Sequence, residues 1–327
     1  MKSYSMQLAD AQLTLELRDI AQPEPGPQQV LVQVHAAGLN RGELIAGYGL
    51  HGKGGAAKPV GMEAAGTVLK CGAGVTHFRV GDRLMGRCPG AFAEFALLDV
   101  REAMFVPDAL SWDEAASIPL TFLVVYDMLV MQGRLKAEEW MLVAGVSSGV
   151  GVAALQTAKA LGAKVIGTSG SAAKLERLAP LGLDVGLCTR SADFHAAVLQ
   201  ATQGQGVNLV VNAVGGSVFA ECVRSMAFEG RLATVGYVDG VLKGEMDIEA
   251  LHAKRLTLFG VSNKLRSPQQ RAQAVPGFAA DLLPLIADGR IKPVVDRVFP
   301  FAQLAQAKAR MESNAHVGKI VLAGSAR

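Results

Sequence analysis

Short apolar runs alternate with helix-length segments through the middle of the chain, and this spacing predicts a parallel sheet covered by helices. The clearest stretch is 141–161, which passes from an apolar strand through a glycine turn into a helix. The other strands predicted here are 164–167, 184–188, 207–212, 231–235 and 257–260. Strands that alternate with helices in this way are typical of a Rossmann-type, doubly wound α/β fold.

The two ends of the chain have a pattern richer in strands and turns. Strands are predicted at 30–34 and 66–69, a turn at 80–83, and a helical apolar segment at 115–131. After residue 260 the predicted elements are a helix at 269–288, a strand at 294–298, a helix at 301–311 and a strand at 319–322. This order favours a β-rich domain (1–118 and 263–327) interrupted by an inserted nucleotide-binding domain (119–262), with the active site in the cleft between them.

The glycine turn at 145–151 carries the most informative motif. Gly149, Gly151 and Ala154 match G-x-G-x-x-[GA], in which glycine permits a tight turn and a close approach of backbone to phosphate. The helix that follows presents free N–H groups and a partial positive charge at its start. The motif therefore predicts a dinucleotide pyrophosphate site.

The residues after the second strand distinguish between the two nicotinamide cofactors. NAD sites usually place a carboxylate there for the ribose 2′-hydroxyl, but residues 168–174 read TSGSAAK. Hydroxyl groups and a cation suit a 2′-phosphate, so Ser169, Ser171 and Lys174 favour NADP(H), with Arg190 as a second cation. The alternative is that Lys174 and Arg190 are ordinary solvated side chains.

Composition narrows the function classes. The chain has 327 residues, which favours two domains, and a formal net charge of +3. That charge is too small and too scattered to favour nucleic acid or membrane as a partner. The sequence contains no apolar run of membrane-spanning length and no signal-peptide core at its N-terminus, so we expect a cytoplasmic protein.

Metal-ligating residues do not cluster along the chain. The four cysteines, Cys71, Cys88, Cys188 and Cys222, are too widely spaced for a metal knuckle, and we expect reduced thiols. The six histidines lack the i, i+4 spacing that places two ligands on one helix face. The sequence therefore predicts no metal site.

Seven segments, in order, resemble the medium-chain dehydrogenase/reductase superfamily. They are residues 23–27, 38–40, 61–66, 80–83, 90–94, 149–151 and 318–321. Within that superfamily the chain is similar to the zinc-free quinone oxidoreductase branch, which also contains enoyl reductases. The resemblance implies a GroES-like catalytic domain around the Rossmann domain. Zinc-dependent members carry an early Cys and a His at positions that read Gly38-Leu39-Asn40-Arg41 and Met62 here.

The absence of these zinc ligands bears on the substrate. Without a Lewis acid, the easier substrates are already electron-poor, namely quinones and α,β-unsaturated carbonyls. The resemblance thus implies an NADPH-dependent, zinc-independent oxidoreductase of the quinone reductase or alkenal/enone reductase type. One alternative is an enoyl-thioester reductase of fatty-acid or polyketide type. Another, from a different class, is an NADPH-binding protein with little turnover.

The resemblance also implies individual roles. Asn40 would position cofactor or substrate, and Tyr48 is the candidate proton donor. The alternative for Tyr48 is an aromatic side chain that only packs against its neighbours. Two family positions differ here: Val124 replaces a Thr near the nicotinamide, and Thr189 replaces a Tyr near the 2′-phosphate. The predicted cofactor-binding residues are Ser147, Ser148, Gly149, Val150, Thr168, Ser169, Gly170, Lys174, Arg190, Asn212, Ala213, Val214, Gly236, Tyr237, Phe259 and Val261.

The apolar segment 256–259 suggests a subunit contact. Pairing this strand with its twin across a two-fold axis would remove an exposed sheet edge. We therefore expect a homodimer, or a tetramer built from such dimers. The expected partner otherwise is a small-molecule substrate.

Overall fold

The computed structural model describes residues 1–9, 12–44 and 56–325. The chain forms two compact units. The first contains Met1–Leu123, Lys264–Gly289 and Pro293–Arg327, and the second contains Val124–Asn263 with Arg290–Lys292. The domain boundaries named above stay a prediction from the sequence.

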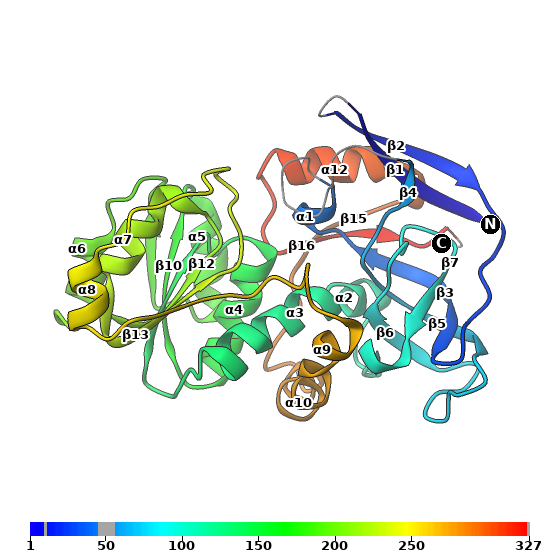
Figure 1. Cartoon of the computed structure of the whole chain (residues 1–327), viewed down its shortest axis with the longest axis horizontal. Coiled ribbons are helices and arrows are strands. Elements are labelled where there is room, and N and C mark those ends of the chain that lie inside the picture. The colour runs from blue at the N-terminus through cyan, green and yellow to red at the C-terminus, as the bar shows by residue number, and fades with distance from the viewer. Residues whose placement is uncertain (10–11, 45–55, 326–327) are drawn as a thin grey trace. The chain divides into compact units, whose positions relative to one another are not determined.

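The second unit is built on a parallel six-stranded sheet with the order β11-β10-β9-β12-β13-β14. Its strands are β9 (Trp140–Ala144), β10 (Lys164–Ser169), β11 (Val185–Cys188), β12 (Val207–Asn212), β13 (Met226–Thr234) and β14 (Thr257–Gly260). Its helices are α4 (Gly149–Ala160), α5 (Ala172–Leu178), α6 (His195–Ala201), α7 (Phe219–Arg224) and α8 (Ile248–Ala253). Figure 1 shows these strands in green to yellow with their helices around them.

The central strands form because their sequences are apolar on both faces. Leu142 and Val143 of β9 and Val210 of β12 are fully buried, as expected for parallel strands covered on both sides. Burying each such side chain contributes about 1.5–3 kcal/mol. β10, β12 and β13 end at the polar residues Ser169, Asn212 and Thr234, and β14 ends at Gly260. Because the strands are parallel, their carboxyl ends form one edge of the sheet.

The first unit is β-rich. Its larger sheet has the order β15-β16-β3-β5-β6-β8, with β7 also paired to β3. These strands are β3 (Gln29–Gly38), β5 (Glu63–Cys71), β6 (Arg83–Arg87), β7 (Phe95–Asp99), β8 (Ala103–Phe105), β15 (Val295–Phe299) and β16 (Lys319–Ala323). A smaller sheet contains β1 (Lys2–Ala9), β2 (Gln12–Asp19) and β4 (Lys58–Pro59). The helices are α1 (Arg41–Leu44), α2 (Trp112–Ala116), α9 (Pro268–Ala272), α10 (Ala274–Asp281), α11 (Leu283–Ala287) and α12 (Leu304–Glu312), and α3 (Pro119–Tyr126) leads into the second unit.

Two predicted helices are broken in the structure. The segment predicted as one helix at 269–288 forms α9, α10 and α11. Pro276 and Pro284 lie in the first turns of α10 and α11, where no intrahelical N–H is needed. The segment at 115–131 is interrupted before Pro119 and continues from α3 into a π-helical turn, Asp127–Gln132. The prediction also missed the β1–β2 hairpin, although the burial of Tyr4 and Met6 follows the alternation of an ordinary strand.

Candidate functional site

The turn between β9 and α4 has the geometry expected of a phosphate-binding loop. Gly145 has a φ of +85°, in the left-handed region that glycine adopts without strain. The Ser148 hydroxyl caps α4: it accepts from the Gly151 N–H at 3.0 Å and donates to the Gly145 carbonyl at 2.8 Å. Among the described residues, no partner is recorded for the backbone N–H of Gly149 or Val150 at the start of α4. These two groups can bind an anion.

Gly151 is required by close packing inside the same turn. A Cβ at this position would lie 2.5 Å from the Gly145 carbonyl oxygen and 2.6 Å from that of Val146. No side chain can occupy this space without a shift of the backbone. The second glycine of the motif is therefore a structural requirement of the turn.

The sheet order brings the predicted cofactor residues to one edge. The chain leaves β9 toward β10 and β11 on one side and later returns to β12, β13 and β14 on the other, so β9 and β12 flank a topological switch point. Ligands of open α/β sheets bind at such points, outside the carboxyl ends of the strands. All predicted cofactor residues lie in this unit, at strand ends, in the turns that follow them or in the first turn of the next helix. They are Ser147 and Ser148 after β9; Gly149 and Val150 at the start of α4; Thr168, Ser169 and Gly170 at the end of β10; Lys174 in the first turn of α5; Arg190 after β11; Asn212, Ala213 and Val214 at the end of β12; Gly236 and Tyr237 after β13; and Phe259 and Val261 at the end of β14.

Two hydroxyls at the end of β10 contact the phosphate turn. The Thr168 hydroxyl accepts from the Gly145 N–H at 3.2 Å. The hydroxyls of Ser169 and Ser147 are 3.4 Å apart. Thr168 therefore holds the turn in place, while Ser147 and Ser169 bring two hydroxyls together at this edge.

Arg190, after β11, lies directly over Gly170. A Cβ at Gly170 would be 2.4 Å from Nε and 2.7 Å from Cζ of the guanidinium. The Arg190 side chain belongs to an exposed residue, and no ion pair or hydrogen bond is recorded for it among the described residues. Gly170 and Arg190 are twenty positions apart in the sequence, and both are predicted to contact the 2′-phosphate. The structure brings them together.

Asn212 has a local structural role. Its side-chain Oδ1 accepts from the N–H groups of Val214 and Gly215, both at 3.0 Å, and its Nδ2 donates to the Gly215 carbonyl at 2.9 Å. These bonds close the loop after β12 and engage the polar atoms of the buried amide. Asn212 therefore shapes the loop that carries Ala213 and Val214.

In the first unit, Asn40 belongs to a buried polar cluster formed with Glu43, Glu63 and Lys319. The Asn40 Nδ2 donates to Oε1 of Glu63 at 2.9 Å and to Oε1 of Glu43 at 3.2 Å. Its Oδ1 accepts from Nζ of Lys319 at 2.7 Å. Both amide hydrogens are engaged, so Asn40 can offer a ligand only the second lone pair of Oδ1.

Charge is concentrated in this cluster. Glu43 is 2% exposed, Glu63 0% and Lys319 6%. Glu63 Oε1 accepts from Lys319 Nζ at 2.7 Å, and its Oε2 accepts from the Leu120 N–H at 2.7 Å. Burial, reinforced by the charge of Glu63, raises the pKa of Glu43 to about 8.

The sequence prediction missed Glu43, Glu63 and Lys319 as a functional group. Two signals were present: Glu63 and Lys319 are charged first residues of the apolar strands β5 and β16, and both lie in the family-like segments 61–66 and 318–321. A charge at that position is usually solvated, so sequence alone favours an exposed side chain. Tyr48, the predicted proton donor, lies outside the described residues.

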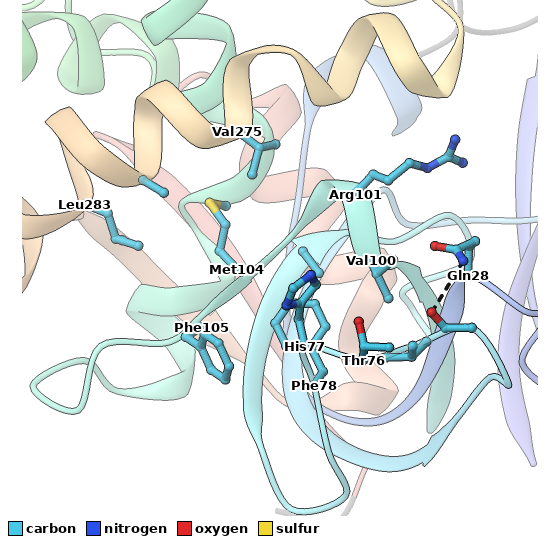
Figure 2. A pocket seen from close by; sticks show the side chains of 14 residues that line it. Gln28, Thr76, His77, Phe78, Val100, Arg101, Met104, Phe105, Val275 and Leu283 are labelled. Atoms are coloured by element: carbon cyan, nitrogen blue, oxygen red, sulfur yellow. Dashed lines mark hydrogen bonds between the residues drawn. The ribbon is translucent and has the colours of Figure 1, made fainter.

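A separate cavity of about 580 Å³ lies within the first unit, between β8, the 74–78 loop, and α10 with α11 (Figure 2). Its lining is mainly apolar and includes Phe78, Met104, Phe105, Val275 and Leu283. Two of its polar groups bond within the protein: Gln28 donates to the Gly74 carbonyl, and Arg101 is paired with Asp99. None of the predicted site residues that the structure describes lines this cavity.

Other features of the described chain bear on chemistry. Burial raises the pKa of the Cys88 and Cys222 thiols to about 12, so both are poor nucleophiles.

In the described ranges no group of three or more His, Cys, Asp or Glu side chains is arranged to hold a metal. None of the helices within those ranges has both the length and the apolar character that crossing a membrane requires.

Comparison with known proteins identifies both units. A model of the alcohol dehydrogenase GroES-like domain matches residues 26–108, and a model of the zinc-binding dehydrogenase family matches residues 149–278. A phenolphthiocerol/phthiocerol polyketide synthase polypeptide from Mycobacterium tuberculosis is 32% identical over 309 residues, which are 94% of this chain and 14% of that protein. The chain thus spans a small part of this relative.

Solved structures match the chain over its whole length. The quinone oxidoreductase of Escherichia coli, complexed with NADPH, has a TM-score of 0.87 and 26% identity, covering 99% of this chain and 100% of that one. The CurK enoyl reductase has a TM-score of 0.85 and 26% identity, covering 98% of each chain. The predicted fold, a Rossmann-type sheet inserted in a GroES-like β-rich domain, is confirmed. The chain belongs to the medium-chain dehydrogenase/reductase superfamily.

Proposed function

We propose that this protein is an NADPH-dependent oxidoreductase that transfers a hydride to a quinone or an α,β-unsaturated carbonyl without zinc. The observation that carries the proposal is the edge of the parallel sheet, where the capped turn at Ser148 and the Arg190–Gly170 contact lie at neighbouring strand ends. The similarity to a quinone oxidoreductase whose structure contains NADPH supports the same cofactor. The remaining predicted cofactor residues are part of this proposal.

The chain's own groups fit NADP(H). The N–H groups of Gly149 and Val150 would bind the pyrophosphate, and the hydroxyls of Ser147 and Ser169 lie 3.4 Å apart at the same edge of the sheet. Arg190 and Lys174 would bind the 2′-phosphate, where a carboxylate would repel it. When bound, the dihydronicotinamide supplies the hydride.

Asn40 has a defined part in this proposal. Its amide is fixed by the charged cluster, with Oδ1 beside Lys319. Because both of its hydrogens are engaged, Asn40 would position a donor group of cofactor or substrate and would not itself donate to a developing enolate. Tyr48 remains the candidate donor for an enone, while a quinone can take its proton from water.

The proposal of zinc-independent chemistry is based on the residue at the position of a zinc ligand. Met62 stands where zinc-dependent relatives carry a His, and its thioether is a poor ligand for zinc. Without a Lewis acid at the carbonyl, the reaction needs a substrate that is already electrophilic. Quinones and activated alkenes meet that condition.

An enoyl-thioester reductase is the second candidate. The similarity to the CurK enoyl reductase, and to one part of a polyketide synthase, favours it specifically. Both candidates use the same hydride donor and differ in the substrate. The alternative of a different class, an NADPH-binding protein with little turnover, predicts saturable binding without oxidation of NADPH.

One assay distinguishes these proposals. Purified protein is mixed with NADPH or NADH and a panel of quinones, enones and an enoyl-CoA, and the absorbance of the reduced nicotinamide is followed. Rapid NADPH-selective oxidation by quinones or enones is the expected result. Turnover of enoyl-CoA and of no other substrate would support the second candidate, an enoyl-thioester reductase. Saturable NADPH binding with no turnover of any substrate would support the binding protein and reject both reductase proposals.

We also propose that the protein is a cytoplasmic homodimer, with a tetramer of such dimers as the larger alternative. β14 is the last strand of its sheet, and Thr257, Leu258 and Gly260 are exposed. An exposed strand edge of this kind can pair with a second copy.

A further inference from the structure

Hydrogen-bond accounting in the Asn40 cluster shows that one of its two carboxyl groups receives no hydrogen bond from the ammonium group of Lys319. Lys319 Nζ has three hydrogens, and they are directed to the Leu39 carbonyl, Asn40 Oδ1 and Glu63 Oε1 at 2.8, 2.7 and 2.7 Å. All three donors are used, and none reaches Glu43. Glu63 is therefore the counter-ion of Lys319.

Glu43 differs from Glu63 in what its two oxygens contact. Its Oε1 accepts from the Asn40 N–H at 2.8 Å and from Nδ2 at 3.2 Å. Its Oε2 is buried and has no hydrogen-bond partner among the residues that the structure describes. An ionised carboxylate with a bare, buried oxygen beside a second carboxylate is costly, and a neutral carboxyl group in the same place costs far less.

Two other charged groups near Glu43, Arg41 and Arg87, have partners elsewhere. Arg41, on the same short helix, donates to the Met311 carbonyl of α12 and to the Asn314 side chain, which follows α12. Arg87 on β6 attracts Glu43 electrostatically, but it is 4.0 Å from Glu102 and no hydrogen bond joins it to Glu43. Among the described residues, the charges that act on Glu43 are thus Glu63 from β5, Lys319 from β16 and Arg87 from β6.

We propose that Glu43 is a positioning residue that works as a neutral carboxylic acid, holding the Asn40 amide through Oε1 and keeping the cluster at zero net charge. Ionisation of Glu43 would give two buried carboxylates and one ammonium. The cluster would then open to water, and Asn40 would lose its fixed orientation. This inference rests on the proposed function only for its effect on catalysis, because the protonation state of Glu43 can be measured without turnover.

The direct test is infrared spectroscopy of the full chain, with glutamate carrying a ¹³C carboxyl label to separate it from aspartate. The wild-type protein should show the band of a buried, protonated carboxyl group at neutral pH, which disappears with a midpoint near pH 8. Glu43→Gln should remove that band. Absence of the band from the wild type at neutral pH would overturn the proposal, and no variant has to fold for that result.

The Glu63→Gln variant tests whether the charge of Glu63 helps to keep Glu43 neutral. Without the Glu63 charge, Glu43 becomes the only carboxylate available to Lys319, so the midpoint should move down by more than one pH unit. A midpoint that stays in place would show that the charge of Glu63 does not reinforce burial in raising the pKa of Glu43, and would refute the charge accounting from which the proposal is argued.

A kinetic test compares the pH profiles of kcat and KM for the wild-type protein and the Glu43→Gln variant. Wild-type kcat/KM should fall about tenfold per pH unit above the midpoint, and Glu43→Gln should lose this alkaline limb. A limb that is the same in both proteins would contradict the positioning role even if the infrared result is as expected. Failure of every substrate to turn over would reject the proposed reductase function, while the infrared result would still decide the protonation state.

Discussion

Arg190 covers Gly170, with its guanidinium so close that a Cβ on residue 170 would lie 2.4 Å from Nε. Gly170 follows β10 and Arg190 follows β11, and these strands are adjacent, with Ser169 opposite Cys188 in the register. The contact therefore places a cation beside the segment where NAD-binding proteins carry a carboxylate. This relationship gives the cofactor proposal its sharpest test.

Gly170→Ala should displace Arg190 and weaken NADPH binding. A methyl group in this space forces the guanidinium to move, and charge-assisted hydrogen bonds to a phosphate contribute about 1.5–3 kcal/mol. We expect the dissociation constant for NADPH to rise about tenfold or more, and that for NADH to change little, as measured by nucleotide fluorescence. Arg190→Ala is the matched variant and should give the same selective loss. Equal loss for both cofactors would show that this corner does not bind the 2′-phosphate.

Ser148→Ala should destabilise the second unit. The hydroxyl caps α4 through the Gly151 N–H, and loss of such a cap costs about 1 kcal/mol. The measurement is the free energy of unfolding from urea titration, with Ser148→Thr as a control that retains the hydroxyl. If alanine and threonine behave alike, the cap does not contribute as described.

Gly38→Ala should destabilise the first unit and disturb the charged cluster. A Cβ here would lie 2.5 Å from Oε1 of Glu63 and 2.6 Å from the Ala116 carbonyl oxygen. Overpacking of this kind costs about 1–3 kcal/mol. Gly260→Ala is the matched control, because nothing lies within 4 Å of its Cβ position. Equal unfolding midpoints for the two variants would argue against the close packing of Gly38 on Glu63.

Stability should fall as pH rises from about 4.5 to about 8, through Glu43. Its folded pKa is raised above the unfolded value, so in this window the folded state binds more protons than the unfolded state. The stabilisation is complete below the unfolded pKa and lost as pH rises through the folded pKa, with a slope of up to about 1.4 kcal/mol per pH unit. Urea titrations of wild type and Glu43→Gln should diverge by this slope. Parallel curves would mean that Glu43 titrates normally.

Leu258→Lys should convert the proposed dimer to a monomer. Leu258 lies on the edge strand β14 and is 37% exposed, so a charge there would oppose pairing with a second copy. Sedimentation velocity should show a dimer for the wild type and a monomer for the variant, with unchanged circular dichroism. A wild-type monomer would rule out the interface.

The sequence by itself determined the parallel sheet and the phosphate turn, because both depend on local pattern. Apolar runs such as that of β9 specify buried strands, and the Gly149–Gly151 spacing specifies a turn whose packing tolerates no side chain at Gly151. It also determined the absence of a carboxylate after β10. These features need only residues that are neighbours along the chain.

Only the tertiary structure decided which distant residues share a site. Strand pairing brought Arg190 onto Gly170, and the approach of β5 and β16 to Asn40 brought Glu63 and Lys319 together from opposite ends of the chain. The neutral state of Glu43 follows from that assembly, because all three hydrogens of the Lys319 ammonium group bond to other acceptors and none bonds to Glu43. Hydropathy records the polarity of a residue, whereas burial and the number of available donors, which set its charge, exist only in the folded chain.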